Sequence, residues 1–282
     1  MRIGISAFAW TAKFTPSHLR ILEEVKELGI EAIEIPMFEP SDLAVSDIRK
    51  AFERARLECT VCAILPDGIN AISPDTDARR RAKQHLRRCV ECAAELGARL
   101  IGGPLYAPIG YIPEYRRTPD QWSWAVEAFQ SLGEVLEACE MTLSIEPVNR
   151  SETSLLRTAA DAKRLCETIG CSRIGVTVDT FHANIEESSI PSAILHLGRR
   201  LKHIHMSEND RGPLGRGHIA FPEIISALRS ISYGGLLMIE GFGYSAEERE
   251  SPGWLWAPDD LSPLEFAKES LQYLTRLTAT LD

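Results

Sequence analysis

The sequence predicts an α/β protein that forms a single (β/α)8 barrel of the TIM type, with residues 1–282 as one domain. Short runs rich in Val, Ile and Leu alternate eight times with longer amphipathic stretches, and such runs are typical of parallel strands buried on both faces. No linker rich in Ser and Gly and no change in composition divides the chain. Eight alternating units in about 250 residues fit one closed barrel.

The elements follow from this alternation. Predicted strands lie at 2–7, 32–35, 59–64, 99–103, 142–146, 174–179, 201–205 and 235–240. Predicted helices lie at 16–28, 45–56, 75–96, 119–139, 158–169, 190–197, 221–230 and 262–278. An open doubly wound sheet is the alternative, but no G-x-G-x-x-G sequence follows the first strand.

Local signals support several helix boundaries. Suitable caps with a proline in the first turn occur at Thr15-Pro16, Thr118-Pro119 and Ser262-Pro263. Glycines that suit helix ends follow three of the helices, at Gly29, Gly97 and Gly170.

Composition limits the classes of partner. The chain has 31 Lys and Arg residues against 40 Asp and Glu residues, a formal net charge of −9. This balance argues against nucleic acid or an anionic membrane as the main partner. No apolar run reaches the roughly 18 residues needed to span a bilayer, and the start MRIGISAFAW has no signal-peptide pattern. We therefore predict a cytoplasmic protein.

The seven cysteines include two C-x-x-C pairs, which can indicate zinc. Cys59 and Cys62 lie in a predicted strand, where positions three apart face opposite sides. Cys89 and Cys92 lie in a predicted helix, on one face that we expect to join the core. Neither pair has a glycine-rich knuckle, so we predict buried, reduced thiols.

Three long connections follow predicted strands, at residues 104–118, 206–220 and 241–260, the last carrying Trp254 and Trp256. All three leave the carboxyl ends of strands, the end of a barrel where active sites form. Loops of this length in a compact domain tend to be functional.

Four side chains that can bind a metal ion end consecutive predicted strands: Glu146, Asp179, His205 and Glu240. In a barrel these positions lie side by side around one rim. Three carboxylates together would repel one another and raise their pKa values unless a cation joins them. Three oxygen donors and one imidazole suit Mn²⁺, Mg²⁺ or Co²⁺ better than a structural zinc site.

Other polar residues follow these positions closely. Glu152 lies six residues after Glu146, His182 three after Asp179, and Arg211 six after His205. Together they place a carboxylate, an imidazole and a cation beside the predicted metal, groups that suit a polyhydroxylated carbonyl substrate. We expect His203 to be a core residue lower in the barrel.

At these residues the sequence resembles a known family. The segments EPVNRSE (146–152), VDTFHANIEE (178–187), KHIHMSENDRGPLGRGH (202–218) and MIEGF (238–242) are similar to motifs of sugar epimerases related to D-tagatose 3-epimerase, in the xylose-isomerase-like barrel superfamily. The resemblance covers nearly the whole chain. It implies metal ligation by Glu146, Asp179, His205 and Glu240, substrate binding by Glu152, His182 and Arg211, and Mn²⁺ as the expected ion.

The implied reaction is 3-epimerisation of a free keto sugar of the D-tagatose, D-psicose or ribulose type. A proton leaves carbon and returns on the opposite face, through an enediolate that the metal stabilises. The resemblance assigns Glu146 and Glu240 as the two bases. No glycine-rich phosphate loop is evident, although Gly215-Arg216-Gly217 could hold an anion.

Alternatives stay open at this point. The same groups would suit an inosose or hydroxypyruvate-type isomerase or dehydratase, or a 3-keto-glycoside lyase. A DNA-repair endonuclease of the superfamily would need more ligands and a basic groove. A sugar-binding or partner subunit would be expected to lack one of the two glutamates. Departures from the family pattern at Phe8-Ala9-Trp10, Ser151 and Trp256-Ala257 lie in the predicted substrate pocket. We expect a homo-oligomer, dimer or tetramer.

Overall fold

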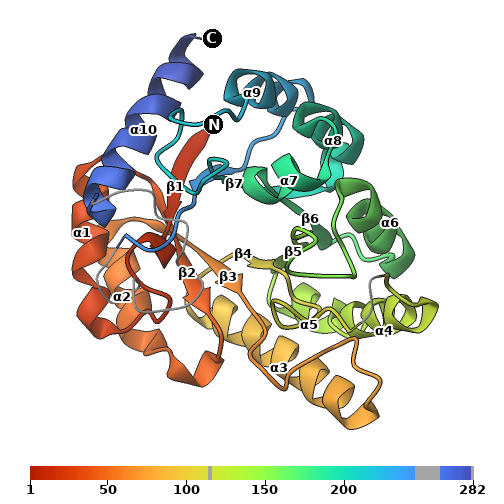
Figure 1. Ribbon diagram of the computed structural model, residues 1–282. Helices are drawn as coiled ribbons and strands as arrows, with labels where there is room; N and C mark the ends of the chain where they lie inside the picture. Colours follow the sequence, from red (N-terminus) through yellow and green to blue (C-terminus); the bar gives the residue numbers. More distant parts are fainter. Residues whose placement is uncertain (114–115, 245–260, 281–282) are drawn as a thin grey trace.

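A computed structural model of the chain describes residues 1–113, 116–244 and 261–280. Strands β1 to β8 form a closed barrel in which each strand pairs in parallel with the next, and β8 pairs with β1. Helices surround this barrel, as seen along its axis in Figure 1. The predicted α/β barrel is therefore confirmed, while one domain over residues 1–282 stays a prediction.

The strands begin and end close to the predicted positions. They are β1 Arg2–Ser6, β2 Ala32–Met37, β3 Glu58–Ala63, β4 Leu100–Gly103, β5 Thr142–Ile145, β6 Ile174–Asp179, β7 Leu201–Met206 and β8 Leu236–Ile239. The α-helices are α1 Arg20–Glu27, α2 Val45–Ala55, α3 Thr76–Glu95, α4 Pro119–Gln130, α5 Gly133–Ala138, α6 Ala159–Ile169, α7 Thr180–Glu186, α8 Ile190–Leu197, α9 Phe221–Ser230 and α10 Pro263–Thr280.

Three helices differ from prediction. The stretch 119–139 is divided into α4 and α5, with Gly133 at the start of the second helix. The stretch 16–28 begins as a short 3-10 turn, Pro16–His18, before α1. Helix α7 was not predicted, because it begins directly at the end of β6 with no intervening loop.

Local chemistry explains other boundaries. The Thr118 hydroxyl accepts a hydrogen bond from the backbone N–H of Gln121 at 3.1 Å, while the Gln121 side chain accepts one from the Thr118 N–H at 2.9 Å. This reciprocal pair satisfies two donors that the helix leaves unpaired. At the other end of a helix, Gly170 has φ 75°, the left-handed conformation that ends α6.

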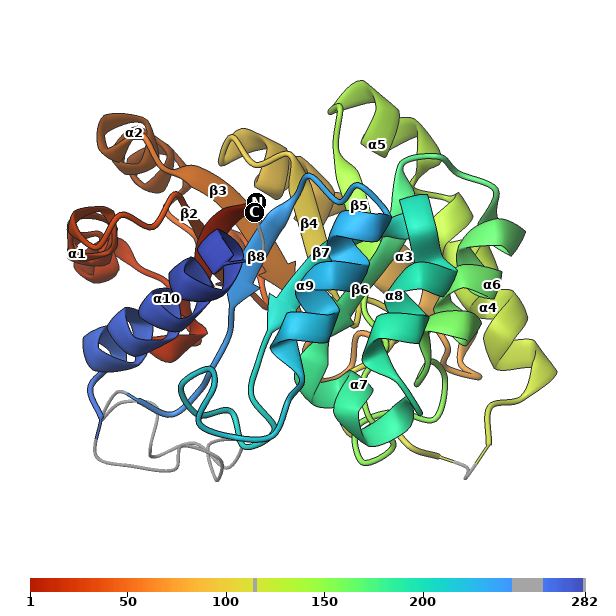
Figure 2. The same ribbon diagram turned by 90° about the horizontal axis from the view of Figure 1, so that it is seen from above.

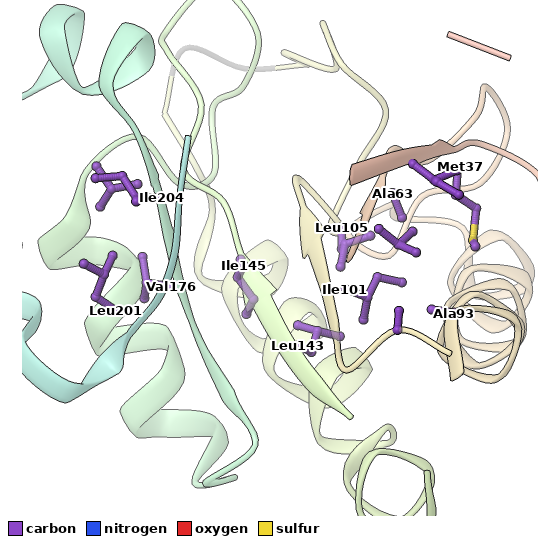
Figure 3. Packing of buried hydrophobic residues seen from close by; sticks show 14 of the residues in the cluster. Met37, Ala63, Ala93, Ile101, Leu105, Leu143, Ile145, Val176, Leu201 and Ile204 are labelled. Carbon is purple, nitrogen blue, oxygen red and sulfur yellow. The ribbon is translucent and has the colours of Figure 1, made fainter. Parts of the chain in front are cut away.

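Alternation along the strands separates two environments. In β6, Val176 and Val178 belong to the hydrophobic core between the barrel and its helices, so Thr177 and Asp179 face the barrel interior. Figure 3 shows part of this core, including Ile101, Leu143 and Val176 from three consecutive strands. A separate apolar cluster of Ala32, Leu236 and Met238 lies at inward-facing positions of β2 and β8.

The cysteines follow the same alternation. Cys59 belongs to the core cluster outside the barrel, whereas Cys62 is grouped with inward-facing polar residues. Cys89 and Cys92 both join the core from α3. All seven cysteines lie in the described part of the chain and are free thiols. No described helix has the length and apolar character needed to cross a membrane.

Candidate active site

The four predicted strand-end residues face one rim of the barrel. Asp179 ends β6 and His205 lies near the end of β7, while Glu146 and Glu240 come directly after β5 and β8. Each stands two positions beyond an inward-facing residue of its strand: Ser144, Thr177, His203 and Met238, respectively. The period of two therefore directs all four side chains inward, and none is more than 3% exposed. In Figure 2, α7 and the loop after β7 lie at this end of the barrel.

His205 lies between two carboxylates. Its Nδ1 is 3.4 Å from Oε1 of Glu146 and 3.5 Å from Oε2 of Glu240. This nitrogen is buried and has no hydrogen-bond partner among the described residues. Burial opposes a charge on the ring, but the charges of Glu240, Glu34 and Glu146 outweigh it and raise the pKa of His205 well above its ordinary value. The environment of Nδ1 therefore favours a positive partner.

Asp179 uses its two carboxylate oxygens differently. Oδ1 accepts a hydrogen bond from the backbone N–H of Phe181 at 2.9 Å and so caps α7. Oδ2 lies 2.8 Å from Nη1 of Arg211 and 3.6 Å from Nε2 of His182. Burial tends to raise the pKa of Asp179, but the charges of Arg211 and the two imidazoles lower it overall. Asp179 therefore remains a carboxylate.

Glu240 has the opposite balance. Burial, together with the negative charges of Asp179 and Glu146, raises its pKa to about 8, even though His205 and Arg211 favour the charged form. Its Oε2 accepts a hydrogen bond from Nη1 of Arg211 at 2.8 Å. Without a divalent cation beside it, the Glu240 carboxyl group tends to hold a proton, and a divalent ion bound here would favour the carboxylate.

Glu34, at an inward-facing position of β2, was not predicted from the sequence as a residue of the site. Its side chain is fully buried, and its two oxygens lie 2.9 Å from Nε2 of His203 and 2.9 Å from Nε2 of His205. Burial tends to raise the pKa of Glu34, but the two histidines lower it overall, so Glu34 is a carboxylate. His203, predicted as a core residue, is buried as expected and shares this partner.

The contact with Glu34 determines which ring nitrogen of His205 carries a hydrogen. A carboxylate can only accept hydrogen bonds, so Nε2 of His205 carries a hydrogen that it donates to Glu34. Nδ1 is then the ring nitrogen left to face Glu146 and Glu240. The signal in the sequence was a glutamate within the buried strand AIEI, where an unpaired charge would be costly.

His182 is fixed by the loop after β5. Its Nδ1 accepts a hydrogen bond from the backbone N–H of Asn149 at 3.3 Å, so Nε2 carries the hydrogen and faces Asp179. The Asn149 amide donates to Oε1 of Glu152 at 2.7 Å. Oε1 of Glu152 also lies 3.9 Å from Nδ1 of His182. Glu152 and His182, predicted from their short spacing to the ligands, are thus brought to the same rim.

Arg211 is held from several sides. Its guanidinium lies 4.2 Å from the ring centre of Phe181 and 4.8 Å from that of Phe242, and it donates to Ser207 Oγ at 2.7 Å. Its backbone has φ 61°, a conformation that non-glycine residues adopt at a cost. The Tyr244 hydroxyl donates to its carbonyl at 2.8 Å. A strained residue fixed in this way at a rim is typical of functional sites.

In the loop after β7, the side chain of Glu208 accepts hydrogen bonds from the backbone of the same loop. The Glu208 carboxylate is fully buried and accepts backbone hydrogen bonds from Asn209, Gly215 and Ile219 at 3.0–3.1 Å. The Gly215-Arg216-Gly217 segment therefore wraps around a carboxylate of the same loop. A side chain at Gly217 would meet Asn209 Oδ1 at 2.0 Å and Glu208 Oε1 at 2.5 Å. The loop after β8 is described only as far as residue 244, so Trp254 and Trp256 lie outside the described residues.

Two groups of side chains in the described residues place ligand atoms within 4.8 Å of one another. One consists of Glu146, Asp179 and His182, and the other of Glu34, Cys62, His205 and Glu240. The four predicted ligands are thus divided between two neighbouring groups that share this rim. Arg211 supplies positive charge between Asp179 and Glu240.

These residues fit a divalent cation. Nδ1 of His205 is a buried nitrogen without a hydrogen-bond partner among the described residues, and two carboxylates flank it. An imidazole oriented through its other nitrogen by a carboxylate is the usual arrangement of a metal-binding histidine. The remaining donors are carboxylate oxygens, which suit Mn²⁺, Mg²⁺ and Co²⁺.

Comparisons with known proteins show the family of the chain. Residues 22–277 match the family model of the xylose isomerase-like TIM barrel. An L-ribulose 3-epimerase of Mesorhizobium japonicum is 35% identical over 242 residues, which cover 86% of this chain and 81% of that protein. A D-psicose 3-epimerase of Ruminiclostridium cellulolyticum is 32% identical over 247 residues, covering 86% and 84%. A solved structure of an L-ribulose 3-epimerase has a TM-score of 0.90 at 31% identity, covering 99% of this chain and 95% of that one.

The chain belongs to the xylose isomerase-like TIM barrel family. Within it, the chain is a carbohydrate epimerase related to the ketose 3-epimerases. The resemblance to the D-tagatose 3-epimerase family and the prediction of an isomerase are therefore confirmed. The alternative of a non-catalytic sugar-binding subunit is not retained.

Proposed function

We propose that the chain is a metal-dependent ketose 3-epimerase that acts on a free keto sugar of the D-tagatose, D-psicose or ribulose type. The proposed ligands are Glu146, Asp179, His205 and Glu240, with Mn²⁺ as the expected ion and Mg²⁺ or Co²⁺ as alternatives. The observation that carries the proposal is the buried Nδ1 of His205, which faces Glu146 and Glu240 without a hydrogen bond to any described residue.

Epimerisation needs a proton to leave carbon next to a carbonyl group and a proton to return on the other face. A divalent ion at this rim, when bound, would stabilise the negative charge that develops on the substrate oxygens. The protein must supply the two proton-transfer groups. Glu146 and Glu240 come from β5 and β8, which are separated by β6 and β7 in the barrel order.

The two glutamates are therefore the proposed acid–base pair. One carboxylate takes the proton from the substrate carbon, and the other, in its protonated form, delivers a proton to the opposite face. In the reverse direction the two groups exchange roles.

The remaining predicted residues hold the substrate. Arg211, fixed between two aromatic rings, is proposed to donate hydrogen bonds to substrate oxygens. His182 and Glu152, joined through Asn149, are proposed to orient the hydroxyl groups. Glu34 is proposed to hold the His205 ring through Nε2. The Glu208 carboxylate accepts the backbone hydrogen bonds of its loop, so these N–H groups are not available to a substrate phosphate. This supports a sugar without phosphate.

The experiment is an assay of the purified protein with Mn²⁺ on free ketohexoses, ketopentoses, inososes and 3-keto glycosides, with products separated by chromatography. Conversion of a ketose to its C3 epimer is expected. Exclusive isomerisation, dehydration or glycoside cleavage would instead support the isomerase, dehydratase or lyase alternatives. A cytoplasmic location and a dimer or tetramer stay predictions, and light scattering after size-exclusion chromatography tests the second.

A further inference from the structure

Cys62 brings a thiol to the candidate metal site. It lies on the inward face of β3, two positions beyond Thr60, whose hydroxyl donates to Glu34 at 3.3 Å. One ligand atom each of Cys62, Glu34, His205 and Glu240 lies within 4.8 Å of the others, and all four residues are buried. The ligand set proposed for the epimerase does not use this thiol.

We propose that Cys62, with His205 and Glu240, forms a binding site for a soft divalent cation such as Zn²⁺ or Cd²⁺, which competes with the harder ion of the epimerase. The inference rests on the proposed function only in that both sites share His205 and Glu240. Such an ion would displace the working ion and inhibit the enzyme.

The donor chemistry distinguishes the two sites. Thiolate sulfur prefers soft ions, whereas carboxylate oxygens suit Mn²⁺ and Mg²⁺. Zinc binds sulfur at about 2.3 Å and imidazole nitrogen at about 2.0 Å in tetrahedral sites. Ligand atoms within 4.8 Å of one another therefore need only small side-chain rotations to surround the ion.

A second observation is independent of the thiol. Nδ1 of His205 is buried and has no hydrogen bond to any described residue, so it can serve as a ligand without breaking a hydrogen bond. Glu240 Oε2 lies 3.5 Å from this nitrogen. A thiolate and one carboxylate together balance the two charges of the ion.

Binding of a soft ion releases protons. The Cys62 S–H bond breaks, a sulfur–metal bond forms, and the thiol proton passes to the buffer, as do the protons that His205 and Glu240 give up to either kind of ion. A cysteine thiol of ordinary pKa, about 8.5, is protonated at neutral pH before the ion arrives. A soft ion should therefore release one proton more than Mn²⁺, which does not use the sulfur.

Cys59 offers a matched control within the same C-x-x-C pair. It is also buried, but it packs in the core outside the barrel and its Sγ lies 3.6 Å from the carbonyl oxygen of Thr60. Cys59→Ser and Cys62→Ser make the same chemical change in one strand, on opposite faces.

The experiment titrates the metal-stripped protein with Cd²⁺ and follows the ultraviolet charge-transfer band of a cadmium–thiolate bond. We expect one ion per chain to produce the band in the wild type and in Cys59→Ser. Cys62→Ser should lose the band and bind Cd²⁺ at least about 100-fold more weakly, because a ligand is lost and even outer contacts cost 10–100-fold. Calorimetry in two buffers should show the additional proton in the wild type, a result that needs no variant to fold.

A wild type without the band, or a Cys62→Ser protein that keeps it, would overturn the inference, as would equal proton release for Cd²⁺ and Mn²⁺. Mn²⁺ binding and epimerisation are measured separately on the wild type. If both are absent while the cadmium band forms, the proposed function fails and the thiol site stands. If both are present without the band, the reverse holds.

Discussion

Oε1 of Glu34 accepts a hydrogen bond from Nε2 of His205 at 2.9 Å, although the two residues are 171 positions apart in the sequence. The contact crosses the barrel interior from β2 to β7. It leaves Nδ1 of His205 facing Glu146 and Glu240, so a residue remote from the predicted motifs determines which nitrogen can bind an ion.

Replacing Glu34 with Gln should weaken Mn²⁺ binding by about 10–100-fold, the usual cost of losing a contact that orients a metal ligand. In Glu34 each oxygen accepts from a different histidine, so the Gln amide would turn an NH₂ donor toward one of the two rings. Calorimetry of Mn²⁺ binding measures the loss, and ¹⁵N NMR of His205 should show a changed tautomer. Thr60→Val removes a 3.3 Å hydrogen bond to Glu34 without changing either imidazole. An equal loss in both variants would contradict the orienting role.

His205→Ala should remove most of the bound metal. The side chain supplies the one imidazole of the proposed ligand set, and without it Glu146 and Glu240 lose the group that lies between them. Elemental analysis of the purified wild type and variant measures ions per chain. His196→Ala, at an exposed position of α8, is the control. Equal metal content in His205→Ala and the wild type would show that this imidazole is not a ligand.

Glu146→Gln and Glu240→Gln should each lower kcat by at least 10²–10⁴-fold, the range that general acid–base catalysis contributes. Glu→Gln retains the size and one oxygen but removes the proton-accepting group. In D₂O the wild type should place deuterium at the epimerised carbon, while each variant exchanges at most one face without inversion. Glu223→Gln, on the exposed face of α9, should be unaffected. Near-normal epimerisation in both site variants would refute the two-base assignment.

Arg211→Lys should raise KM by about tenfold, which corresponds to about 1.4 kcal/mol. Lysine keeps the charge but loses the planar stacking against Phe181 and Phe242 and the forked donors, and cation–π contacts alone contribute about 0.5–2 kcal/mol. Steady-state kinetics on the accepted ketose give the value. Arg216→Lys, in the same loop but paired with Glu269 at the surface, is the comparison. A KM unchanged in Arg211→Lys would argue against contact with the substrate.

The rate of thiol modification should differ between the buried and the part-exposed cysteines. Burial raises the pKa of Cys92 to about 11 and that of Cys166 to about 12, so at pH 8 both remain neutral thiols, and the thiolate is the reactive form. Raising the pH toward these values increases the thiolate fraction. With iodoacetamide at pH 8, mass spectrometry should find label on the part-exposed Cys139 and Cys171 long before the buried residues. Rapid labelling of Cys166 in the folded protein would contradict the described burial.

Much of the fold could be predicted from local pattern. Buried parallel strands require short runs of Val, Ile and Leu, and β6 begins and ends as those runs indicate. Helix α7 could not be predicted in the same way, because Asp179 both ends the strand and caps the helix. The division of 119–139 depends on how α4 and α5 pack, which local propensity does not determine.

Some residues of the site could likewise be predicted from local pattern, and others could not. Glu146, Asp179, His205 and Glu240 could be found because alternation and strand ends are both visible in the sequence. Glu34 and Cys62 could not, since each lies within a strand and meets its partners only when the barrel closes. A glutamate in a buried strand signals that a partner exists, but the sequence does not say where.

Asp179 links the rim to the stability of a neighbouring helix. One oxygen caps α7, and the other faces Arg211 and His182. A cation that holds this carboxylate in place would also hold the first turn of α7, and by thermodynamic linkage the folded helix would favour the bound cation. Amide hydrogen exchange in residues 180–186 should therefore slow as an ion is added, so this short helix would report the occupancy of the site without substrate or turnover.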